Sequence, residues 1–305
     1  MDSQTCALLT AMGGAIGSPQ LRRLGIDSDT VTRWVRLGLL RRVRRGAFVD
    51  PRVWDAADLD GRYRLTVMAV MRSRETEEPA THHSALALHG LPLWHVPRSL
   101  TMLIGDVSES VTHSGLRITP LRAHTNRTEV DGLPVLAVAD AIVTTASVNV
   151  EAGVVAADAA LHEEQCTQDD LDEAHERLRR GLRGTARLRR TIALVDPAAE
   201  SPGESRLRLI LDALGVPFET QRRILDGKRF VARVDFLVAG KVVVEFDGLL
   251  KYRGEDGEEA VIAEKLREDR IRALGYAVVR VTWAELAEPH LIRARLLAAV
   301  EQLAA

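Results

Sequence analysis

The sequence predicts a mixed α/β protein built from three parts. In residues 1–40, apolar side chains such as Val31, Trp34 and Val35 recur at helical spacing. In the last hundred residues, short runs of branched apolar residues that suit strands stand between helical segments. The segment 196–203 combines Pro, Gly, Ser and acidic residues, which is typical of a linker. We therefore expect parts at 1–50, 51–196 and 197–305.

The composition indicates a folded protein and excludes several classes. Of the 305 residues, 46% are hydrophobic and 28% charged, which argues against disorder. Cys6 and Cys166 lie far apart without metal-ligand spacing, so we expect neither a disulfide scaffold nor a zinc site. No secretory leader pattern and no run of about 18 apolar residues occurs, so we expect a cytoplasmic protein with no membrane partner.

The charge is unevenly distributed, although the net charge of −2 does not suggest a nucleic-acid partner. Residues 1–50 carry eight Arg against four acids, and residues 175–190 carry seven Arg against one Glu. Arginine suits contact with phosphate, but a GC-rich coding bias explains its abundance equally well. Segment 175–190 is thus a candidate DNA-facing helix or a merely solvated one.

Residues 1–50 predict three helices followed by a hairpin. A short helix at about 4–12 precedes 18–25, where Ser18 can cap a helix and Pro19 takes its first position. A third helix in 27–40 stops at Gly38, and 39–49 reads as a hairpin. This order is typical of a winged helix-turn-helix, whose third helix enters the major groove of duplex DNA while the wing lies beside the backbone. The candidate DNA-binding residues, with a solvated face as the alternative, are Arg33, Arg36, Arg41, Arg42, Arg44 and Arg45.

The middle part is less regular and offers no chemistry. We expect a helix at 62–73, strands at 100–105, 115–119 and 134–139, and helices at 151–164 and 167–180, the last capped by Thr167 and Asp170. The histidines in this part lack ligand spacing, and we expect them in cores or caps: His82, His83, His89 and His95.

The last part predicts a small sheet with helices at both ends. A helix starts at Ser201, a strand lies near 219–225, and a hairpin of two strands covers 231–247. A charged helix at 257–275, a strand at 276–282 and a final helix from Thr282 complete the order.

Three carboxylates interrupt the hairpin strands, namely Asp235, Glu245 and Asp247. Glu245 and Asp247 share one side of their strand because side chains alternate. Asp235 joins them only if the turn 239–241 has three residues, since a two-residue turn would place Asp235 opposite Val244. Carboxylates this close repel unless a cation intervenes, and Mg²⁺ (or Mn²⁺) suits such oxygen ligands in phosphodiester hydrolysis. The alternative is a solvent-facing acidic row paired with Arg233 and Lys241.

These residues resemble a known family. The pattern D235-F, VVVE245-F-D247-G-x-x-K251, E264-K-x-R267-x-D269-R270 and G275-Y-x-V-V-R280 resembles the very-short-patch-repair (Vsr-like) endonucleases of the PD-(D/E)XK restriction-endonuclease-like superfamily. The resemblance covers about residues 200–303 and implies a restriction-endonuclease-like mixed sheet flanked by helices.

The resemblance also implies roles for single residues. It makes Asp235 and Glu245 the Mg²⁺ ligands of a DNA endonuclease, with Asp247 as an auxiliary acid. Glu204 matches an upstream site acid, although Ser201 and Glu204 also form a capping box. The usual lysine of the family is Asp247 here, and Lys251 is the candidate cation near the phosphate.

The N-terminal half resembles another group. Residues 1–50 with 82-HHSALALHGLP-92 are similar to AbiEi-type antitoxins and related transcriptional regulators, which implies DNA binding and a partner toxin or homo-oligomer. We therefore expect a metal-dependent DNA endonuclease. The alternatives are a non-enzymatic DNA-binding regulator with a decayed nuclease fold and an interaction scaffold acting through the middle part.

Overall fold

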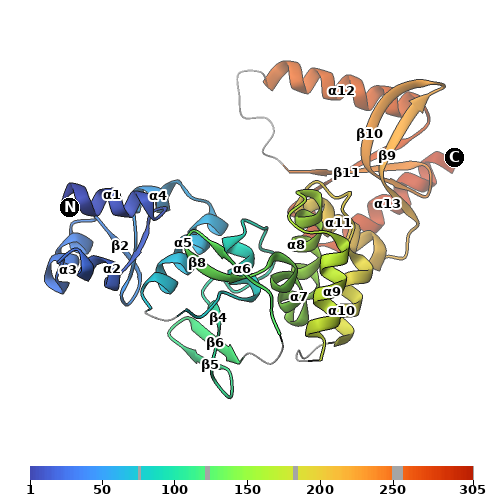
Figure 1. Ribbon diagram of the computed structural model, residues 1–305. Helices are drawn as coiled ribbons and strands as arrows, with labels where there is room; N and C mark the ends of the chain where they lie inside the picture. The colour runs from blue at the N-terminus through green and yellow to red at the C-terminus, as the bar shows by residue number, and fades with distance from the viewer. Residues whose placement is uncertain (75–76, 121–123, 181–184, 249–256, 305) are drawn as a thin grey trace. The chain divides into compact units, whose positions relative to one another are not determined.

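The computed structural model shows a mixed α/β protein that divides into two compact units, Met1–Ala193 and Leu194–Ala305 (Figure 1). The structure describes residues 1–74, 77–120, 124–180, 185–248 and 257–304. The border between the units lies just before the predicted linker 196–203.

The first fifty residues form six short elements around one core. Asp27 begins the third helix by accepting a hydrogen bond from the Thr30 backbone N–H at 2.7 Å, and Gly38, with φ of 70°, follows its end. Trp34 and Phe48 pack in this core. The elements are α1 (Ser3–Ala11), β1 (Ala15–Gly17), α2 (Ser18–Arg23), α3 (Ser28–Arg36), β2 (Arg41–Arg44) and β3 (Ala47–Val49), with sheet order β1-β3-β2.

Two details in this region differ from the prediction. Strand β1 was not expected, because three residues are too few to show alternation. It shifts the start of α2, so that Gly17 rather than Ser18 is the N-cap residue. Glycine has no side chain that could accept a capping hydrogen bond. The Gln20 side chain instead accepts a hydrogen bond from the Gly17 N–H at 3.0 Å.

A buried arginine ties these fifty residues to helix α5 (Leu59–Arg72). Arg72 is only 6% exposed, and its guanidinium donates to the carbonyl oxygens of Met12, Ala15 and Asp131. Gly17 lies so close that a Cβ there would stand 2.1 Å from the Arg72 carbonyl oxygen. Residues 1–50 and α5 therefore pack as parts of the same unit.

The rest of the first unit combines small sheets with a helical layer. Strand β4 runs parallel to β6, β5 runs antiparallel to β6, and β7 and β8 form a hairpin. The predicted strand at 134–139 ends at Leu136, because Ala137 already caps the next helix. The elements are α4 (Pro51–Ala56), α6 (His82–Leu88), β4 (Thr101–Gly105), β5 (Val111–His113), β6 (Leu116–Pro120), β7 (Arg127–Val130), β8 (Leu133–Leu136), α7 (Val138–Val148), α8 (Val150–His162), α9 (Gln168–Leu178) and α10 (Thr185–Leu194).

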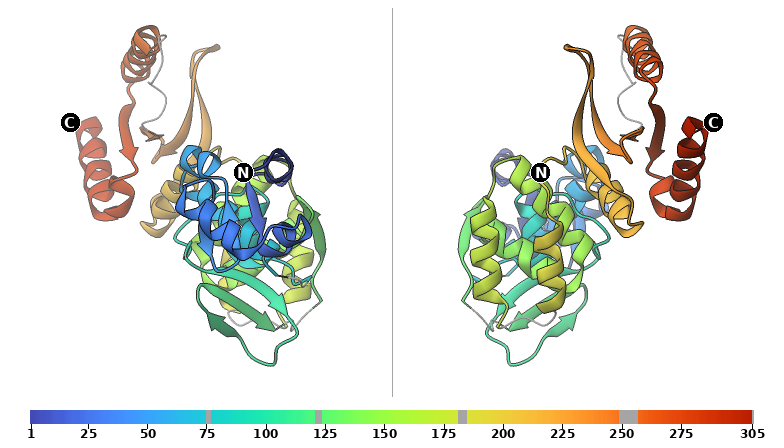
Figure 2. Two further views of the ribbon diagram at one scale, coloured as in Figure 1. Left: turned by 90° about the vertical axis from the view of Figure 1, so that its left-hand side faces the viewer. Right: turned by 90° about the vertical axis from the view of Figure 1, so that its right-hand side faces the viewer.

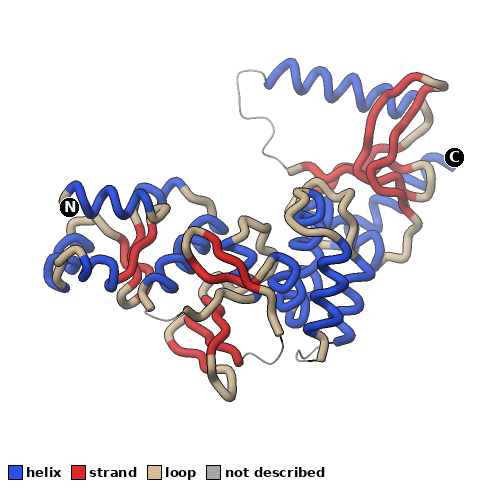
Figure 3. The backbone as a smooth tube through the Cα atoms, in the orientation of Figure 1, coloured by secondary structure: helices blue, strands red, loops and turns tan. Residues whose placement is uncertain are grey.

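The second unit is a four-stranded sheet with helices on both sides (Figure 3). Its strand order is β12-β11-β10-β9, with β11 and β12 parallel and the other pairs antiparallel. The final helix begins at Pro289, not Thr282, because a short 3-10 turn intervenes, in which Glu285 accepts from the Thr282 N–H at 2.8 Å. The elements are α11 (Pro202–Ala213), β9 (Phe218–Asp226), β10 (Arg229–Val238), β11 (Val242–Asp247), α12 (Gly257–Ala273), β12 (Ala277–Thr282), η1 (Glu285–Ala287) and α13 (Pro289–Ala304).

Two apolar clusters lie on the sides of this sheet. Val242 and Val244 pack with Leu207 of α11 and Ile292 of α13, whereas Val243 packs with Ile271 of α12. The first turn of α11 reaches β11 closely because residue 203 is glycine, and a Cβ there would stand 2.0 Å from the Phe246 ring. This contact places the N-terminus of α11 beside the acidic end of β11.

Three of the four histidines singled out from the sequence lie in the core or at a helix cap, as predicted, whereas His95 is exposed and its ring stacks on that of Trp94. His83 and His89 bond through Nε2 to the carbonyl oxygens of Leu100 and Leu136, at 3.0 and 2.7 Å. Nδ1 of His82 lies 3.0 Å from the Thr81 hydroxyl, and this residue has φ of 51°. Burial lowers the pKa of His82 to about 3, so the ring stays neutral in the folded protein.

This neutral histidine predicts a loss of stability in acid. The unfolded chain takes up a proton at His82 below about pH 6.5 and the folded chain does not, so folding weakens as the pH falls toward 3. Each such group contributes up to about 1.4 kcal/mol per pH unit. His82→Asn, which tolerates positive φ and cannot titrate, should flatten the decline by roughly 2 kcal/mol between pH 6.5 and 5. Urea unfolding followed by tryptophan fluorescence measures this, and parallel profiles of the two proteins would contradict it.

Candidate metal and nucleic-acid site

The turn between β10 and β11 determines how the acids are placed. It has three residues, 239–241, with Ala239 and Gly240 at φ of 49° and 69°, and the strands pair Val238 with Val242. The three-residue alternative is thus confirmed. The pairing ends at Phe236–Val244, so Asp235 and Glu245 each lie one residue beyond the last pair of their strands.

Asp235 interrupts its strand rather than extending the pairing. Its Oδ2 accepts a hydrogen bond from the backbone N–H of Phe246 at 2.8 Å, so a side chain takes a donor that a regular ladder would give to a backbone carbonyl. Val234 and Leu237 both pack in the cluster with Ile271, so the alternation of sides breaks between them. Across the hairpin, Gln221 has φ of 47°. The Asp235 carboxylate is held against the backbone beside Glu245.

Glu245 is buried and paired with an arginine that comes from α12. It is 8% exposed, and Nη2 of Arg267 donates to its Oε1 and Oε2 at 2.8 and 2.9 Å. Burial raises the pKa of the Glu245 carboxyl, and the positive charge of Arg267 acts against this rise. A buried carboxylate at the end of a central strand therefore keeps a cation in direct contact.

The ion pair is part of a larger cluster on the α12 side of the sheet. Arg267 also donates to Glu264, through Nε at 2.9 Å and through Nη2 at 2.8 Å. Arg280, the parallel-strand neighbour of Glu245, donates to Glu264 and lies 2.9 Å from Glu268. Three carboxylates and two guanidinium groups thus join α12 to β11 and β12.

Glu204 has the capping role that the sequence offered as one alternative. Ser201 Oγ accepts from the Glu204 N–H at 3.2 Å, while Glu204 accepts from the Glu200 N–H at 3.0 Å and from the Ser201 hydroxyl at 2.7 Å. The side-chain amide of Gln221 also donates to Glu204 at 3.1 Å. Because Gln221 stands across the hairpin from Asp235, the capping acid borders the same corner of the sheet.

The two remaining predicted site residues differ in what the structure says of them. Asp247 is half-buried at the end of β11 and pairs in register with Thr282 of β12. Lys251 lies outside the described residues, and its predicted role stays a prediction.

A metal ion would meet two carboxylates here rather than three. No three His, Cys, Asp or Glu side chains among the described residues gather where an ion could bind. Mg²⁺ commonly uses only one or two carboxylates and completes its shell with water and substrate phosphate. Asp235 and Glu245 fit that requirement as hard oxygen donors, but the ion and Arg267 would compete for Glu245.

The six arginines predicted to bind DNA fall into two groups. Arg33, Arg36 and Arg45 are exposed, and Arg36 and Arg45 make no ion pair with any residue in the described ranges. The other three contact their own unit. Arg41 lies 3.3 Å from Asp55, the Arg42 guanidinium lies 5.7 Å from the Phe48 ring centroid, and Arg44 donates to the His113 carbonyl at 3.0 Å.

Two arginines of the segment 175–190 contact other parts of their own unit. Arg177 pairs with Asp140, which is 1% exposed, and Arg187 donates to the Ser147 carbonyl at 3.2 Å. Arg189 and Arg190 on α10 are exposed and keep the DNA-facing alternative open for that helix.

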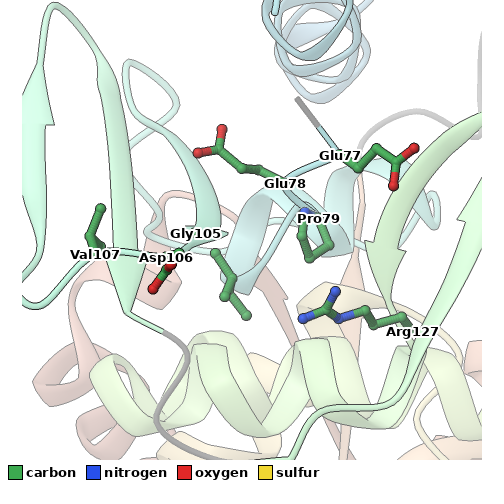
Figure 4. Close-up of a pocket in the computed structure, with 8 residues that line it drawn as sticks. Glu77, Glu78, Pro79, Gly105, Asp106, Val107 and Arg127 are labelled. Atoms are coloured by element: carbon green, nitrogen blue, oxygen red, sulfur yellow. The ribbon is translucent and has the colours of Figure 1, made fainter. Parts of the chain in front are cut away.

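Sequence reasoning did not anticipate a pocket of about 460 Å³ in the first unit (Figure 4). Its walls carry Glu77, Glu78 and Asp106, with Arg127 across from them. Glu78 accepts from Arg74 at 2.8 Å, and a Cβ on Gly105 would come within 2.9 Å of the Glu78 carboxylate. Such acidic walls repel a nucleic-acid backbone, so the pocket does not extend the candidate interface.

Comparison with known proteins adds no assignment. No protein-family model matches the chain, and no curated protein matches it. None of the helices in the described parts of the chain has both the length and the apolar character needed to span a membrane.

The competition for Glu245 yields a prediction. Arg267→Gln removes the guanidinium and leaves a buried carboxylate without its partner, which should destabilise the second unit by roughly 3 kcal/mol in metal-free buffer. Millimolar Mn²⁺ should then stabilise the variant more than the wild type, and a hundredfold excess over Kd contributes about 2.7 kcal/mol. Thermal unfolding of the full chain with and without Mn²⁺ measures both effects.

Arg272→Gln is the matched control, because it removes a partly exposed pair with Glu268 on the same helix. Equal Mn²⁺ effects in wild type, Arg267→Gln and Arg272→Gln would show that no ion reaches Glu245. A gain that persists in Glu245→Gln would lead to the same conclusion.

Proposed function

We propose that the chain is a DNA-binding protein whose second unit hydrolyses phosphodiesters with Mg²⁺ or Mn²⁺. The observation that carries this proposal is the hydrogen bond from the Phe246 N–H to Asp235 at 2.8 Å, which holds the Asp235 carboxylate beside Glu245 where the β10–β11 pairing ends. Support comes also from the mixed sheet with helices on both sides, which the resemblance to Vsr-like endonucleases implies, and the two acids lie on its two middle strands.

Each described residue of the site has a separate task in this proposal. Asp235 and Glu245 would hold the ion, which when bound polarises the phosphoryl group and lowers the pKa of an attacking water. The Phe246 N–H fixes the Asp235 carboxylate, and Gly203 lets α11 approach the same strand. Arg267, once released from Glu245, carries a planar pair of donors that matches phosphate oxygens. In the Vsr-like resemblance the usual lysine position, two residues after Glu245, is occupied by Asp247. Arg267 of α12 would supply the positive charge in its place.

Duplex DNA would be bound mainly by the first fifty residues. Helix α3 presents Arg33 and Arg36 outward, and the β2–β3 turn presents Arg45. In a winged helix module these positions lie at the major groove and beside the backbone. Arg41, Arg42 and Arg44 contribute less in this proposal because they already have partners within their own unit.

A non-enzymatic regulator is the second candidate, and one contact favours it. Arg267 already neutralises Glu245, which is the state expected of a nuclease fold that has exchanged its ion for a permanent ion pair. Such a protein would keep the DNA-binding module, as the resemblance to AbiEi-type regulators implies, and act with a partner toxin or as a homo-oligomer.

Cleavage assays separate these two candidates. Supercoiled and linear duplex DNA should be cut by the wild type in Mg²⁺ or Mn²⁺ and not in chelator, because the two carboxylates act only through the ion. Asp235→Asn and Glu245→Gln should abolish cutting without weakening DNA binding. Asp212→Asn, which changes an exposed acid on α11, is the matched control. A wild type that binds DNA but never cuts would establish the regulator.

The exposed arginines of the first unit can be tested by the salt dependence of binding. Arg36→Ala with Arg45→Ala should lower the slope of log K against log salt by about 2, near one per lost phosphate contact. The comparison variant is Arg189→Ala with Arg190→Ala, which removes the same charge from α10. If the α10 variant lost the slope and the α3–wing variant kept it, the DNA-binding face would have to be reassigned to α10.

A further inference from the structure

The outer part of the β9–β10 hairpin is a ribbon of two strands that carries excess positive charge. Strand β10 pairs with β9 from Arg229 to Val238 but with β11 only from Phe236 to Val238. The ribbon therefore extends past the rest of the sheet, with α12 beside it (Figure 2). Residues 219–233 hold five basic side chains against two acids, which is a net charge of +3.

Only one side of this ribbon is covered. Ile224, Ala232 and Val234 are at most 3% exposed and pack in the cluster with Ile271 of α12. The other side chains of the ribbon include charged and aromatic groups in solvent. The ribbon thus has a buried apolar side, which holds it on α12, and a second side without an apolar role.

The exposed side contains two arrangements that are unfavourable in water alone. Arg223 stands directly opposite Arg233, and like charges in that position destabilise a strand pair. Phe230 and Leu225 also form a cross-strand pair, and they are 51% and 48% exposed. The Arg223 guanidinium lies 5.2 Å from the Phe230 ring centroid, so the ring orients this cation.

Ion pairs offset only part of the charge. Arg233 pairs with Glu200, and Arg222 lies 3.1 Å from Glu219. Arg223, Lys228 and Arg229 make no ion pair with any residue in the described part of the chain. At the ribbon end these three cations, one of them held by an exposed ring, outnumber the single acid Asp226, which stands opposite Arg229, so the surface is complementary to a polyanion.

We propose that this ribbon end is a second DNA-binding surface, which contacts backbone phosphates of the same duplex that reaches Asp235 and Glu245. This inference rests on the proposed function for the identity of the polyanion. Phosphates would relieve the Arg223–Arg233 repulsion, and a bound duplex would cover Phe230 and Leu225.

The spacing along β10 sets where the ribbon end would meet this duplex. Arg229 lies six residues from Asp235 on one strand, which at about 3.3 Å per residue is roughly 20 Å. Duplex DNA rises about 3.4 Å per base pair, so the ribbon end would meet phosphates about six base pairs to one side of the scissile phosphate. The predicted footprint is therefore asymmetric about the cleavage position.

The test compares two double variants of the full chain that lose the same charge. Arg223→Ala with Arg229→Ala removes two ribbon cations, while Lys241→Ala with Arg293→Ala removes two exposed cations elsewhere in the same unit. Binding of a 30-base-pair duplex is measured in chelator over a range of salt. The ribbon variant should lower the salt slope by about 2 and weaken binding about 10–100-fold at 0.1 M salt, and the control should change neither. Arg223→Lys with Arg229→Lys should restore most of the slope, because it restores the charge.

The outcomes distinguish this inference from the proposed function. A ribbon variant with the wild-type slope, alongside a loss in the α3–wing variant, overturns the ribbon surface and leaves the proposed function intact. Loss of slope in a protein that never cleaves DNA supports the ribbon surface and overturns the nuclease. If the ribbon variant keeps its DNA affinity but loses binding to poly-glutamate, the surface serves an acidic protein and the DNA assignment is wrong.

Discussion

A buried carboxylate needs a counter-charge, and in the second unit Arg267 supplies it to Glu245. The cost of an unpaired charge at 8% exposure is far greater than the worth of an exposed ion pair. This requirement explains why α12, which is rich in charged residues, packs closely on the sheet. Arg267 ties the helix to Glu245 of β11, and Glu264 ties it to Arg280 of β12. The Arg267–Glu245 pair therefore belongs both to the candidate site and to the contact between α12 and the sheet. An ion that binds Glu245 would have to displace Arg267 and weaken this contact.

The irregularity at Asp235 has consequences on both sides of that residue. Toward the turn, β10 pairs with β11 and is buried on both sides of the sheet. Beyond Asp235, the strand leaves β11 and continues only with β9. The Asp235 side chain, which accepts a hydrogen bond from the Phe246 N–H, thus lies at the fork where β10 leaves β11 and continues with β9 alone. In the proposed function, the carboxylate at this fork would hold the ion while the cations along the ribbon would contact phosphates of the same DNA backbone.

Local chemistry allowed the sequence to predict much of the fold. Ser201 with Glu204 and the Thr167–Asp170 pair begin helices where expected, because caps act within four residues. Gly240 is compatible with the three-residue turn, but its presence alone did not exclude a two-residue turn. The Arg267–Glu245 pair was not predictable, since 22 residues separate its members and Glu264, three residues away, is the obvious local partner. Strand β1 was missed because three residues are too few to show alternation, and the start of α13 was missed because the local Thr282–Glu285 hydrogen bond forms a short turn before it.

Arginine content alone left phosphate binding and coding bias indistinguishable, and the partners of each side chain now show which arginines serve packing. Arg72 serves three backbone carbonyls and Arg177 serves the buried Asp140, so neither is available to a ligand. A guanidinium with satisfied donors in the protein gains little from a phosphate, because it must first give up those bonds. Arg36 and Arg45 in the first unit and Arg223 and Arg229 in the second have no such bond to give up among the described residues. In the proposed function, DNA would therefore contact the exposed arginines that have no partner among the described residues. That set is small in a chain whose net charge is −2.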